Sequence, residues 1–437
     1  MTTPAHEGHA ASAFNWRKVP TAAPDVGAPP PFFIYETPAL NQTALLHCEK
    51  VQDWPFDDSA AEVPMLRLLS QHSARVMDPE AAALYIIPLL PRISHRAQNC
   101  LGMDHARRME AAARALAASP HFVRRRGSDH LLITNTFRLA SFGAVLPLLQ
   151  NASVGWFEHP LAEKKHKGPN KLYDQAAWRC TIVVPYLVSP FCRTRPALPA
   201  PDERPTSVFF QGSVDAGRGV RRHFEHLNAF PRADVANQSR SEILKVARED
   251  RGSSSRFSPR GTAEGMLRSQ FCLVPKGDTP TSSRLYLALA CGCAPILISN
   301  EFAPHQPFLH VLPPSKHFWN VGLRANRTEG LGEGPRPLFI LEPAFMKDPL
   351  GTLTVKLQGS AGLGAHLREL RAALEDIAPD VLYDVEHSRV AHNTLLEWKA
   401  ACSGAEPPPP GLLLASGRGA KAKGHGKAAG KSVPRVH

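Results

Sequence analysis

The chain has 437 residues, of which 43% are apolar and 21% are charged, and its formal net charge is +12. This composition is normal for a soluble globular protein, and its longest apolar runs are too short to cross a bilayer. The length exceeds what one hydrophobic core usually holds, so two domains are expected. Nucleic-acid binding rests only on the net charge and a basic C-terminal tail. No recognition motif is present, so no nucleic-acid partner is expected.

The first half alternates short apolar runs with helical patterns. Strands are expected at "FFIYETP", "AALYIIPLL", "SDHLLITN", "ASVGWFE" and "CTIVVPY". Helices are expected near residues 61–75 and 103–118. Such alternation indicates βα units and a parallel sheet. Residues 1–31 are rich in Pro and Ala and are interpreted as a leader or linker, and residues 32–195 as a first domain.

A Pro-rich break over 189–205 is interpreted as the domain boundary. After it, strands are expected at "TSVFFQGS", "FCLVP" and "APILIS", with helices near 217–229, 282–291 and 365–377. Residues 205–400 therefore form a second α/β domain with closing helices. The tail over 403–437 is of low complexity and basic, with six Lys and Arg against Glu406 alone, and is interpreted as disordered.

The eight cysteines show no paired CxxC spacing, and four zinc ligands cannot be assembled. Cys291 and Cys293 flank a glycine and are interpreted as a tight helix end, with no metal site. Four cysteines of the first half are candidates for disulfides in an oxidising compartment: Cys48, Cys100, Cys180 and Cys192. Four Asn-X-Ser/Thr sequons give weak support for a secretory route. They begin at Asn41, Asn151, Asn237 and Asn326.

The stretch "PKGDTPTSSR" at 275–284 lies between a predicted strand and a predicted helix. Ligands of open α/β sheets bind at the carboxyl ends of strands, and a helix N-terminus suits phosphate. Ser282 and Ser283 are candidate ligands of a phosphate oxygen, and Arg284 is a candidate bidentate ligand of a diphosphate. An ordinary capped helix, with Thr281 or Ser282 as N-cap, is an equal alternative.

The stretch "VFFQGSVDAGRGVRRHF" repeats this arrangement after another strand. Gly212 allows a ligand to approach the backbone closely. Arg218, Arg221 or Arg222 is a candidate contact for an anion. A solvated basic helix face is the alternative. Two such loops in one domain favour a site for a nucleotide diphosphate.

The segment "MLRSQFCLVPKGDTPTSSRLYLALACGCAPILIS" resembles the signature of exostosin-type glycosyltransferases, family 47. The likeness continues in order through "FFIYETP", "ARVMDPEAAALYIIPLL", "RRRGSDHLLITN", "TIVVPY" and "VFFQGS", and covers about 32–310. The resemblance implies a GT-B fold of two Rossmann-like domains that face a cleft. It also implies inverting transfer of a hexosyl or pentosyl group from a nucleotide sugar to a glycan or glycoprotein hydroxyl, without cofactor or metal.

The resemblance also assigns site residues. Donor-binding positions are Gly212, Arg221, Arg222, Gly277, Asp278, Ser282, Ser283 and Arg284. Asp129 and His130 match a segment on the acceptor side, where His130 is a candidate general base. A structural Asp–His pair that holds a strand end is the alternative.

The sequence departs from the family pattern in two ways. Leu287 stands where the family has an acidic residue, which in GT-B enzymes usually binds the donor ribose. Three outcomes are open: donor affinity is weaker, Glu301 compensates, or the protein is a catalytically inactive glycan- or nucleotide-binding partner. Members are typically anchored in the Golgi, so a Golgi lumen or membrane location is implied, yet no signal or transmembrane segment is found. Association with itself or other transferases is a further expectation from the family.

Overall fold

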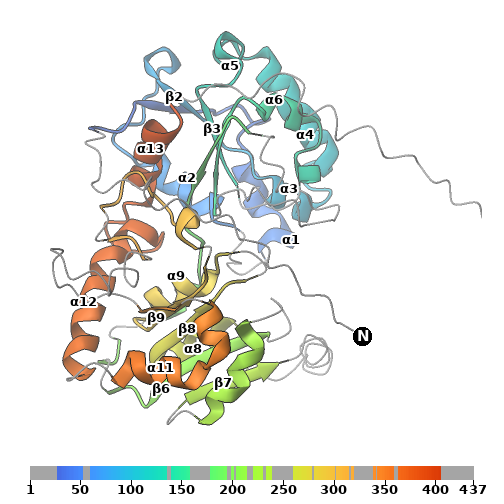
Figure 1. Cartoon of the computed structure of the whole chain (residues 1–437). Coiled ribbons are helices and arrows are strands. Elements are labelled where there is room, and N and C mark those ends of the chain that lie inside the picture. The colour runs from blue at the N-terminus through green and yellow to red at the C-terminus, as the bar shows by residue number, and fades with distance from the viewer. Residues whose placement is uncertain are drawn as a thin grey trace, which may run out of the picture.

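The computed structural model contains two parallel β-sheets of five strands each, which lie in two lobes (Figure 1). The structure describes residues 27–52, 60–134, 139–157, 178–193, 198–200, 203–213, 220–229, 233–238, 259–277, 280–300, 302–313, 316–318, 338–340, 342–358 and 363–404. Most of the predicted leader and of the predicted basic tail lies outside these residues. The expected α/β class with parallel sheets is confirmed.

The first sheet holds its strands in chain order. These are β1 (Phe32–Ile34), β2 (Leu84–Ile87), β3 (His130–Ile133), β4 (Ser153–Trp156) and β5 (Cys180–Val183). Every neighbouring pair is parallel. All five strands therefore end at the same edge, and β1 and β5 are the two outer strands of the sheet.

Both faces of this sheet are buried, as continuous apolar strands require. Along β2, Leu84 and Ile86 pack into one hydrophobic cluster, while Tyr85 and Ile87 pack into another. This alternation follows from the two-residue period of a strand. Helices must therefore cover both faces.

The helical segments of the first lobe connect these strands. They are η2 (Thr43–His47), α1 (Glu49–Gln52), α2 (Glu62–Ser70), η3 (Pro79–Ala81), α3 (Pro91–Ala97), α4 (His105–Ala118), α5 (Pro120–Arg125), η4 (Leu139–Val145) and α6 (Leu146–Leu149). Three of them begin at polar caps, since Asp78, Asp104 and Ser119 accept from backbone N–H groups of η3, α4 and α5. The cluster with Met65 and Leu69 holds α2, and the cluster with Met109 and Leu116 holds α4. The two helices thus cover opposite faces.

The second sheet has the strand order β10-β9-β8-β6-β7. Its strands are β6 (Thr206–Ser213), β7 (Ala233–Gln238), β8 (Ser269–Pro275), β9 (Ala294–Ile298) and β10 (Leu338–Ile340). The chain begins in β6, moves outward to β7, and then returns to β8 on the other side of β6. In doubly wound sheets this reversal between the first and third strands marks the ligand-binding crevice.

The second lobe adds helices around this sheet and along the side of the molecule. They are η6 (Pro190–Cys192), η8 (Val220–Ala229), α8 (Pro259–Leu267), α9 (Ser283–Ala290), η9 (Ala303–His305), α10 (Glu342–Lys347), α11 (Pro349–Gln358) and α12 (Leu363–Val381). The basic helix predicted at 217–229 is a 3-10 segment, η8, over the described residues. Figure 1 shows α12 running beside both lobes.

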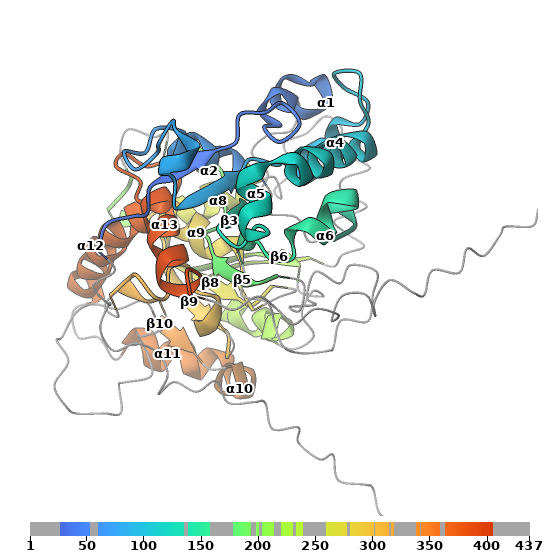
Figure 2. The same cartoon turned by 90° about the horizontal axis from the view of Figure 1, so that it is seen from above.

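The last helix, α13 (Val390–Ala401), packs on the first sheet although it follows the second sheet in the chain. Figure 2 shows α13 beside α2, and the Thr394 hydroxyl lies 3.8 Å from the Met65 sulfur. The Trp398 indole donates to Ser153 Oγ of β4 at 3.0 Å. The first lobe is therefore completed by the C-terminal end of the described chain.

All eight cysteines form disulfides. The pairs are Cys48–Cys100, Cys180–Cys402, Cys192–Cys291 and Cys272–Cys293. The expectation that the four cysteines of the first half are disulfide candidates is met, but only one pair lies within that half. The tight helix end predicted at Cys291 and Cys293 is also the site of two disulfides. Within the described residues no helix is long and apolar enough to span a membrane.

Candidate functional site

Two loops converge at the switch point of the second sheet. β6 ends at Gly212 and Ser213, and β8 ends at Pro275, followed by Lys276 and Gly277. Because β6 and β8 are parallel neighbours, both loops leave the same edge. The predicted donor loops are therefore adjacent in space.

The second loop leads directly into α9. Ser282 is the N-cap: its backbone is extended, and its hydroxyl accepts from the Arg284 N–H at 3.4 Å. Ser283 is the first residue of the helix. The Gly277 N–H donates to the Thr281 carbonyl at 3.2 Å and closes the loop. Ser282 therefore caps the helix as predicted, and the same helix presents its positive N-terminal end at the switch point.

Arg284 connects the two loops. Its Nε donates to the Gln211 carbonyl at 3.2 Å, and its Cζ lies 5.3 Å from the centre of the Phe210 ring. A Cβ atom built on Gly212 would lie 2.9 Å from Arg284 Cζ and would overlap its terminal nitrogen. The guanidinium can therefore lie here only because residue 212 has no side chain.

A second guanidinium reaches the same edge from η8. Arg221 is 5% exposed, and its Nη2 donates to the Lys276 carbonyl at 2.9 Å. The side chain of Arg222, the other predicted contact on this helix, lies outside the described residues, as do Asp278 and Glu301.

Sequence reasoning missed an ion pair at this edge. Lys276 Nζ lies 2.9 Å from Glu342 Oε2, and Glu342 is 6% exposed at the start of α10. The other carboxylate oxygen accepts from the Asn300 N–H at 3.1 Å, just after β9. The signal available in the sequence was an acidic residue at a helix start directly after a strand. The pair fixes the Lys276 ammonium beside Gly277.

The first lobe meets the donor loop through Tyr186, which follows β5. Its hydroxyl lies 3.1 Å from Thr281 Oγ1, and its ring lies 5.7 Å from the ring of Tyr286 on α9. Phe157, which follows β4, packs on Tyr186 at 4.5 Å. The carboxyl edge of the first sheet therefore approaches the candidate donor site.

Three cationic side chains and a helix N-terminus gather at this edge. Arg221, Lys276 and Arg284 carry the charges, and the carboxylate of Glu342 is paired with Lys276. Such an arrangement attracts an anion with several oxygens. It can also stabilise negative charge that develops on a departing diphosphate.

The side chain of Leu287 is half-buried against an apolar cluster. It packs against the buried cluster of Cys192, Phe209 and Met266, to which Phe191 and Leu198 also contribute. Burial of an apolar side chain in an apolar cluster is favourable. The local structure is thus adapted to leucine at this position.

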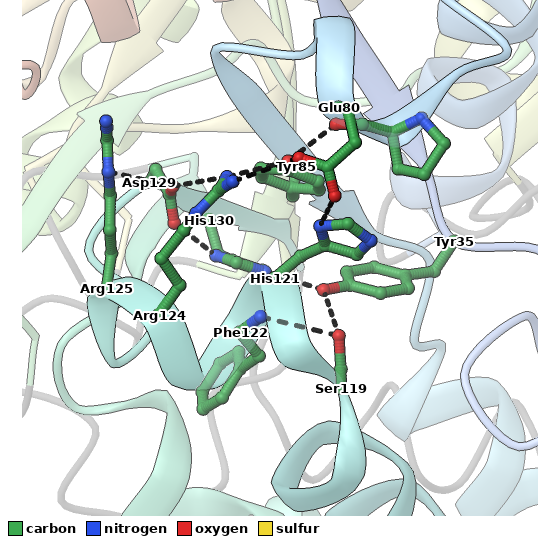
Figure 3. Close-up of polar contacts among 11 residues, drawn as sticks. Tyr35, Glu80, Tyr85, Ser119, His121, Phe122, Arg124, Arg125, Asp129 and His130 are labelled. Atoms are coloured by element: carbon green, nitrogen blue, oxygen red, sulfur yellow. Dashed lines mark hydrogen bonds and ion pairs between the residues drawn. The ribbon is translucent and has the colours of Figure 1, made fainter.

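Asp129 and His130 are not brought to this site. They lie at the amino end of β3, whereas the donor loops leave carboxyl ends of strands. His130 is fully buried, its Nδ1 lies 2.8 Å from Asp129 Oδ1, and its Nε2 lies 2.8 Å from the Tyr35 hydroxyl (Figure 3). An ionised carboxylate can only accept, so Nδ1 carries the proton and Nε2 accepts from Tyr35. No lone pair remains for a substrate proton.

The surrounding groups fix this network. Burial lowers the pKa of His130, against the opposing hydrogen bond and charge of Asp129, so the ring is neutral. Burial raises the pKa of Tyr35 to about 12. The Tyr35 hydroxyl lies 3.0 Å from Ser119 Oγ, the N-cap of α5. The alternative of a structural Asp–His pair at a strand end fits this placement.

No group of three or more His, Cys, Asp or Glu side chains that could hold a metal ion occurs in the described part of the chain.

A protein-family model and several probable glycosyltransferases match more than half of this chain. A model of the exostosin GT47 domain matches residues 28–316. A probable beta-1,4-xylosyltransferase, IRX10L, of Arabidopsis thaliana is 26% identical over 64% of this chain and 65% of its own length. A probable glucuronosyltransferase, Os03g0107900, of Oryza sativa subsp. japonica is 25% identical over 58% of this chain and 57% of its own.

A probable glucuronoxylan glucuronosyltransferase of Arabidopsis thaliana is 25% identical over 61% of this chain and 56% of its own. The chain thus matches less than two thirds of the length of each of these relatives. A solved structure, the GtfA/B complex, aligns with a TM-score of 0.35 and 12% identity over 67% of this chain and 61% of that chain. Because the family model spans the whole first sheet and the second sheet through β9, the chain belongs to the exostosin GT47 glycosyltransferase family.

Proposed function

We propose that the protein is an inverting glycosyltransferase that moves a sugar from a nucleotide diphosphate sugar to a glycan or glycoprotein hydroxyl. The observation that carries this proposal is the pairing of Arg284 with Gly212 at the switch point. Arg221 and Lys276 border the same place. A diphosphate bound there would meet two guanidinium groups, one ammonium group and the N-terminus of α9.

The reaction is a single displacement. The acceptor oxygen forms a bond to the anomeric carbon as the bond from that carbon to the diphosphate oxygen breaks. The acceptor hydroxyl loses its proton to a general base, and the diphosphate leaves with both bonding electrons. Arg284 and Arg221 stabilise the charge that develops on the diphosphate. The two lobes form the cleft, with the donor on the second lobe and the acceptor on the first, and no metal or cofactor is required.

The sugar is proposed from the relatives. Their names specify xylosyl and glucuronosyl transfer, so UDP-xylose and UDP-glucuronate are the first donors to test. β-1,4-linked xylo-oligosaccharides are the matching acceptors. The four disulfides support an oxidising secretory compartment, in which the family's Golgi location is proposed for this chain.

The test is calorimetric titration of the protein with UDP, GDP, UDP-xylose and UDP-glucuronate, followed by transfer to xylo-oligosaccharides. Binding of one nucleotide should weaken by about tenfold to a hundredfold in Arg284→Ala, since charged hydrogen bonds are lost. Arg268→Ala is the matched control, because Arg268 is exposed beside the amino end of β8. Equal affinity in both variants would contradict the site. Binding without transfer would favour the inactive-partner alternative.

A further inference from the structure

One of the four sequons lies on the surface of the folded first lobe. It begins at Asn41, in the loop that follows β1, and ends at Thr43, the first residue of η2. Asn41 is half-buried and Thr43 is exposed. An enzyme that attaches a glycan must recognise the hydroxyl residue together with the asparagine. Both residues can be reached in the folded protein.

The hydrogen bonds of the sequon fix the orientation of the Asn41 amide. Its Oδ1 accepts from the Thr43 backbone N–H at 3.2 Å and from the Thr43 hydroxyl at 2.7 Å. A backbone N–H can only donate, so the atom that it contacts must be the amide oxygen. The nitrogen Nδ2, to which N-linked glycans are attached, therefore lies on the other side of the planar amide.

A second sequon, which begins at Asn151, has a different environment. The next two residues, Ala152 and Ser153, are fully buried, and Ser153 belongs to the inner strand β4. The Ser153 Oγ accepts from the Trp398 indole at 3.0 Å. An enzyme can thus contact this hydroxyl only before the first lobe is complete. The side chain of Asn237 and the sequon at Asn326 lie outside the described residues.

Asn41 and Thr43 also line a cavity beside the outer strand β1. The cavity has a volume of about 540 Å³. Leu46 and Val63 are part of its lining and are half-buried, so they expose apolar surface in the cavity. Removing apolar surface from water is favourable. A group attached to Asn41 would therefore gain stability by covering this lining.

We propose that Asn41 carries an N-linked glycan whose first sugar covers this cavity. The donor is an oligosaccharide held on a diphosphate carrier. Asn41 Nδ2 forms a bond to its anomeric carbon as the bond from that carbon to the diphosphate oxygen breaks. Nδ2 loses one proton, and the diphosphate leaves with the bonding electrons. The transferring enzyme is a separate protein of the secretory compartment, so the inference rests on the location proposed above and not on the activity of this chain.

The place of Asn41 in the cavity wall brings the first sugar to the apolar lining. The sugar is tethered through one side chain, so it meets Leu46 and Val63 at a high effective concentration. The C–H face of a pyranose ring can pack on these aliphatic side chains while its hydroxyl groups stay at the surface. The Glu36 side chain, which lines the same cavity and is 58% exposed, can accept from one of those hydroxyls.

The first test is site-specific mass spectrometry of the full chain, directed into the secretory pathway of a eukaryotic host. Titration of free thiols selects molecules that have entered the oxidising compartment, since all eight cysteines are paired in the folded protein. We expect a glycan on Asn41 in most molecules and a lower occupancy at Asn151. Thr43→Val should abolish the Asn41 glycan as Asn41→Gln does, whereas Thr43→Ser should keep it. An unmodified Asn41, or an occupancy no higher than that of Asn151, would overturn the inference.

The second test concerns the contact between the first sugar and the cavity. Trimming by an endoglycosidase that leaves one N-acetylglucosamine should keep the melting temperature, whereas Asn41→Gln should lower it by about 2–4 °C. The difference between wild type and Asn41→Gln should vanish when both are made with N-glycosylation inhibited. Equal melting temperatures of the glycosylated wild type and Asn41→Gln would overturn the contact. Nucleotide affinity should be the same in both proteins, so a failure of this inference is distinguishable from a failure of the proposed function.

Discussion

Arg284 occupies the space that a side chain at position 212 would fill. The Cβ of any other residue there would lie 2.9 Å from Arg284 Cζ, while Arg284 Nε donates to the neighbouring Gln211 carbonyl. The two residues lie far apart in the chain, on β6 and on α9. The position of the Arg284 guanidinium therefore depends on residue 212 being a glycine.

Gly212→Ala should weaken nucleotide binding nearly as much as Arg284→Ala, because the added methyl group displaces the guanidinium. In calorimetry we expect a loss of about tenfold to a hundredfold in affinity. The double variant should be no weaker than either single one, since the two changes remove the same contact. Gly404→Ala is the control, because nothing lies within 4 Å of a Cβ there. Additive losses would show that the two residues act separately.

The His130 network should contribute to stability and not to proton transfer. Tyr35→Phe removes the donor to His130 Nε2 and should lower the free energy of unfolding by about 1–3 kcal/mol. His130→Gln should lower it as well. The kcat per folded molecule should stay near the wild-type value in both. If His130 were the base, kcat would fall by about 10²–10⁴-fold in His130→Gln, with less effect in Tyr35→Phe.

The substitution Leu287→Glu tests whether position 287 serves to bind the donor ribose or to pack against an apolar cluster. An acid there would tighten donor binding if the ribose contact were vacant. The structure instead packs Leu287 on an apolar cluster with Phe209 and Met266. We therefore expect a loss of about 1–3 kcal/mol in the free energy of unfolding, with nucleotide affinity unchanged. Leu287→Met, which conserves volume, should be close to neutral. A lower Kd for UDP in Leu287→Glu would show that the ribose contact had been restored.

His310 should make stability depend on pH. Its Nδ1 lies 2.7 Å from the buried carboxylate of Glu397 on α13, and this hydrogen bond raises the pKa of His310 against the effect of its burial. The folded state thus holds the proton more tightly than the unfolded chain, whose value is about 6.5. The stabilisation is complete below that pH and is lost as the pH rises through the folded pKa.

The measurement is the denaturant midpoint of unfolding between about pH 5.5 and 8.5, a range that brackets the histidine pKa, for wild type and His310→Gln. The difference between the two should shrink as the pH rises. His387→Gln is the control, because the His387 side chain is 86% exposed. A difference that stays constant across this range would show that the pair does not titrate with folding.

The fold could be predicted from the sequence where the evidence is local. Each strand buried on both faces is a short apolar run, and helical segments separate most of the consecutive strands in the described part of the chain, so the α/β class follows. The grouping of Gly212, Gly277 and Arg284 could be predicted because loops at carboxyl ends of parallel strands share one edge. The side chains that contact these loops from other elements could not be predicted. Glu342 reaches Lys276 only through the order of β8, β9 and β10, which local pattern does not contain.

The cysteine pairs illustrate the same limit. Cys180 and Cys402 are separated by 222 residues, and their pairing depends on the return of α13 to the first sheet. Asp129 and His130 show the converse case. Their residue types suit catalysis, but burial at the amino end of β3 and a hydroxyl from Tyr35 determine what they do.

The position of α13 has a consequence for the order in which the chain folds during synthesis. Domains of a nascent chain commonly fold one after another from the N-terminus. Here one face of the first sheet is not fully covered until Thr394 and Trp398 of α13 have been synthesised. The ribosome adds these residues after the whole second lobe. Until then, the apolar residues beneath α13 are exposed to solvent. We expect the N-terminal lobe expressed alone, without residues 390–404, to aggregate, and a chain that includes them to become protease-resistant in one late step.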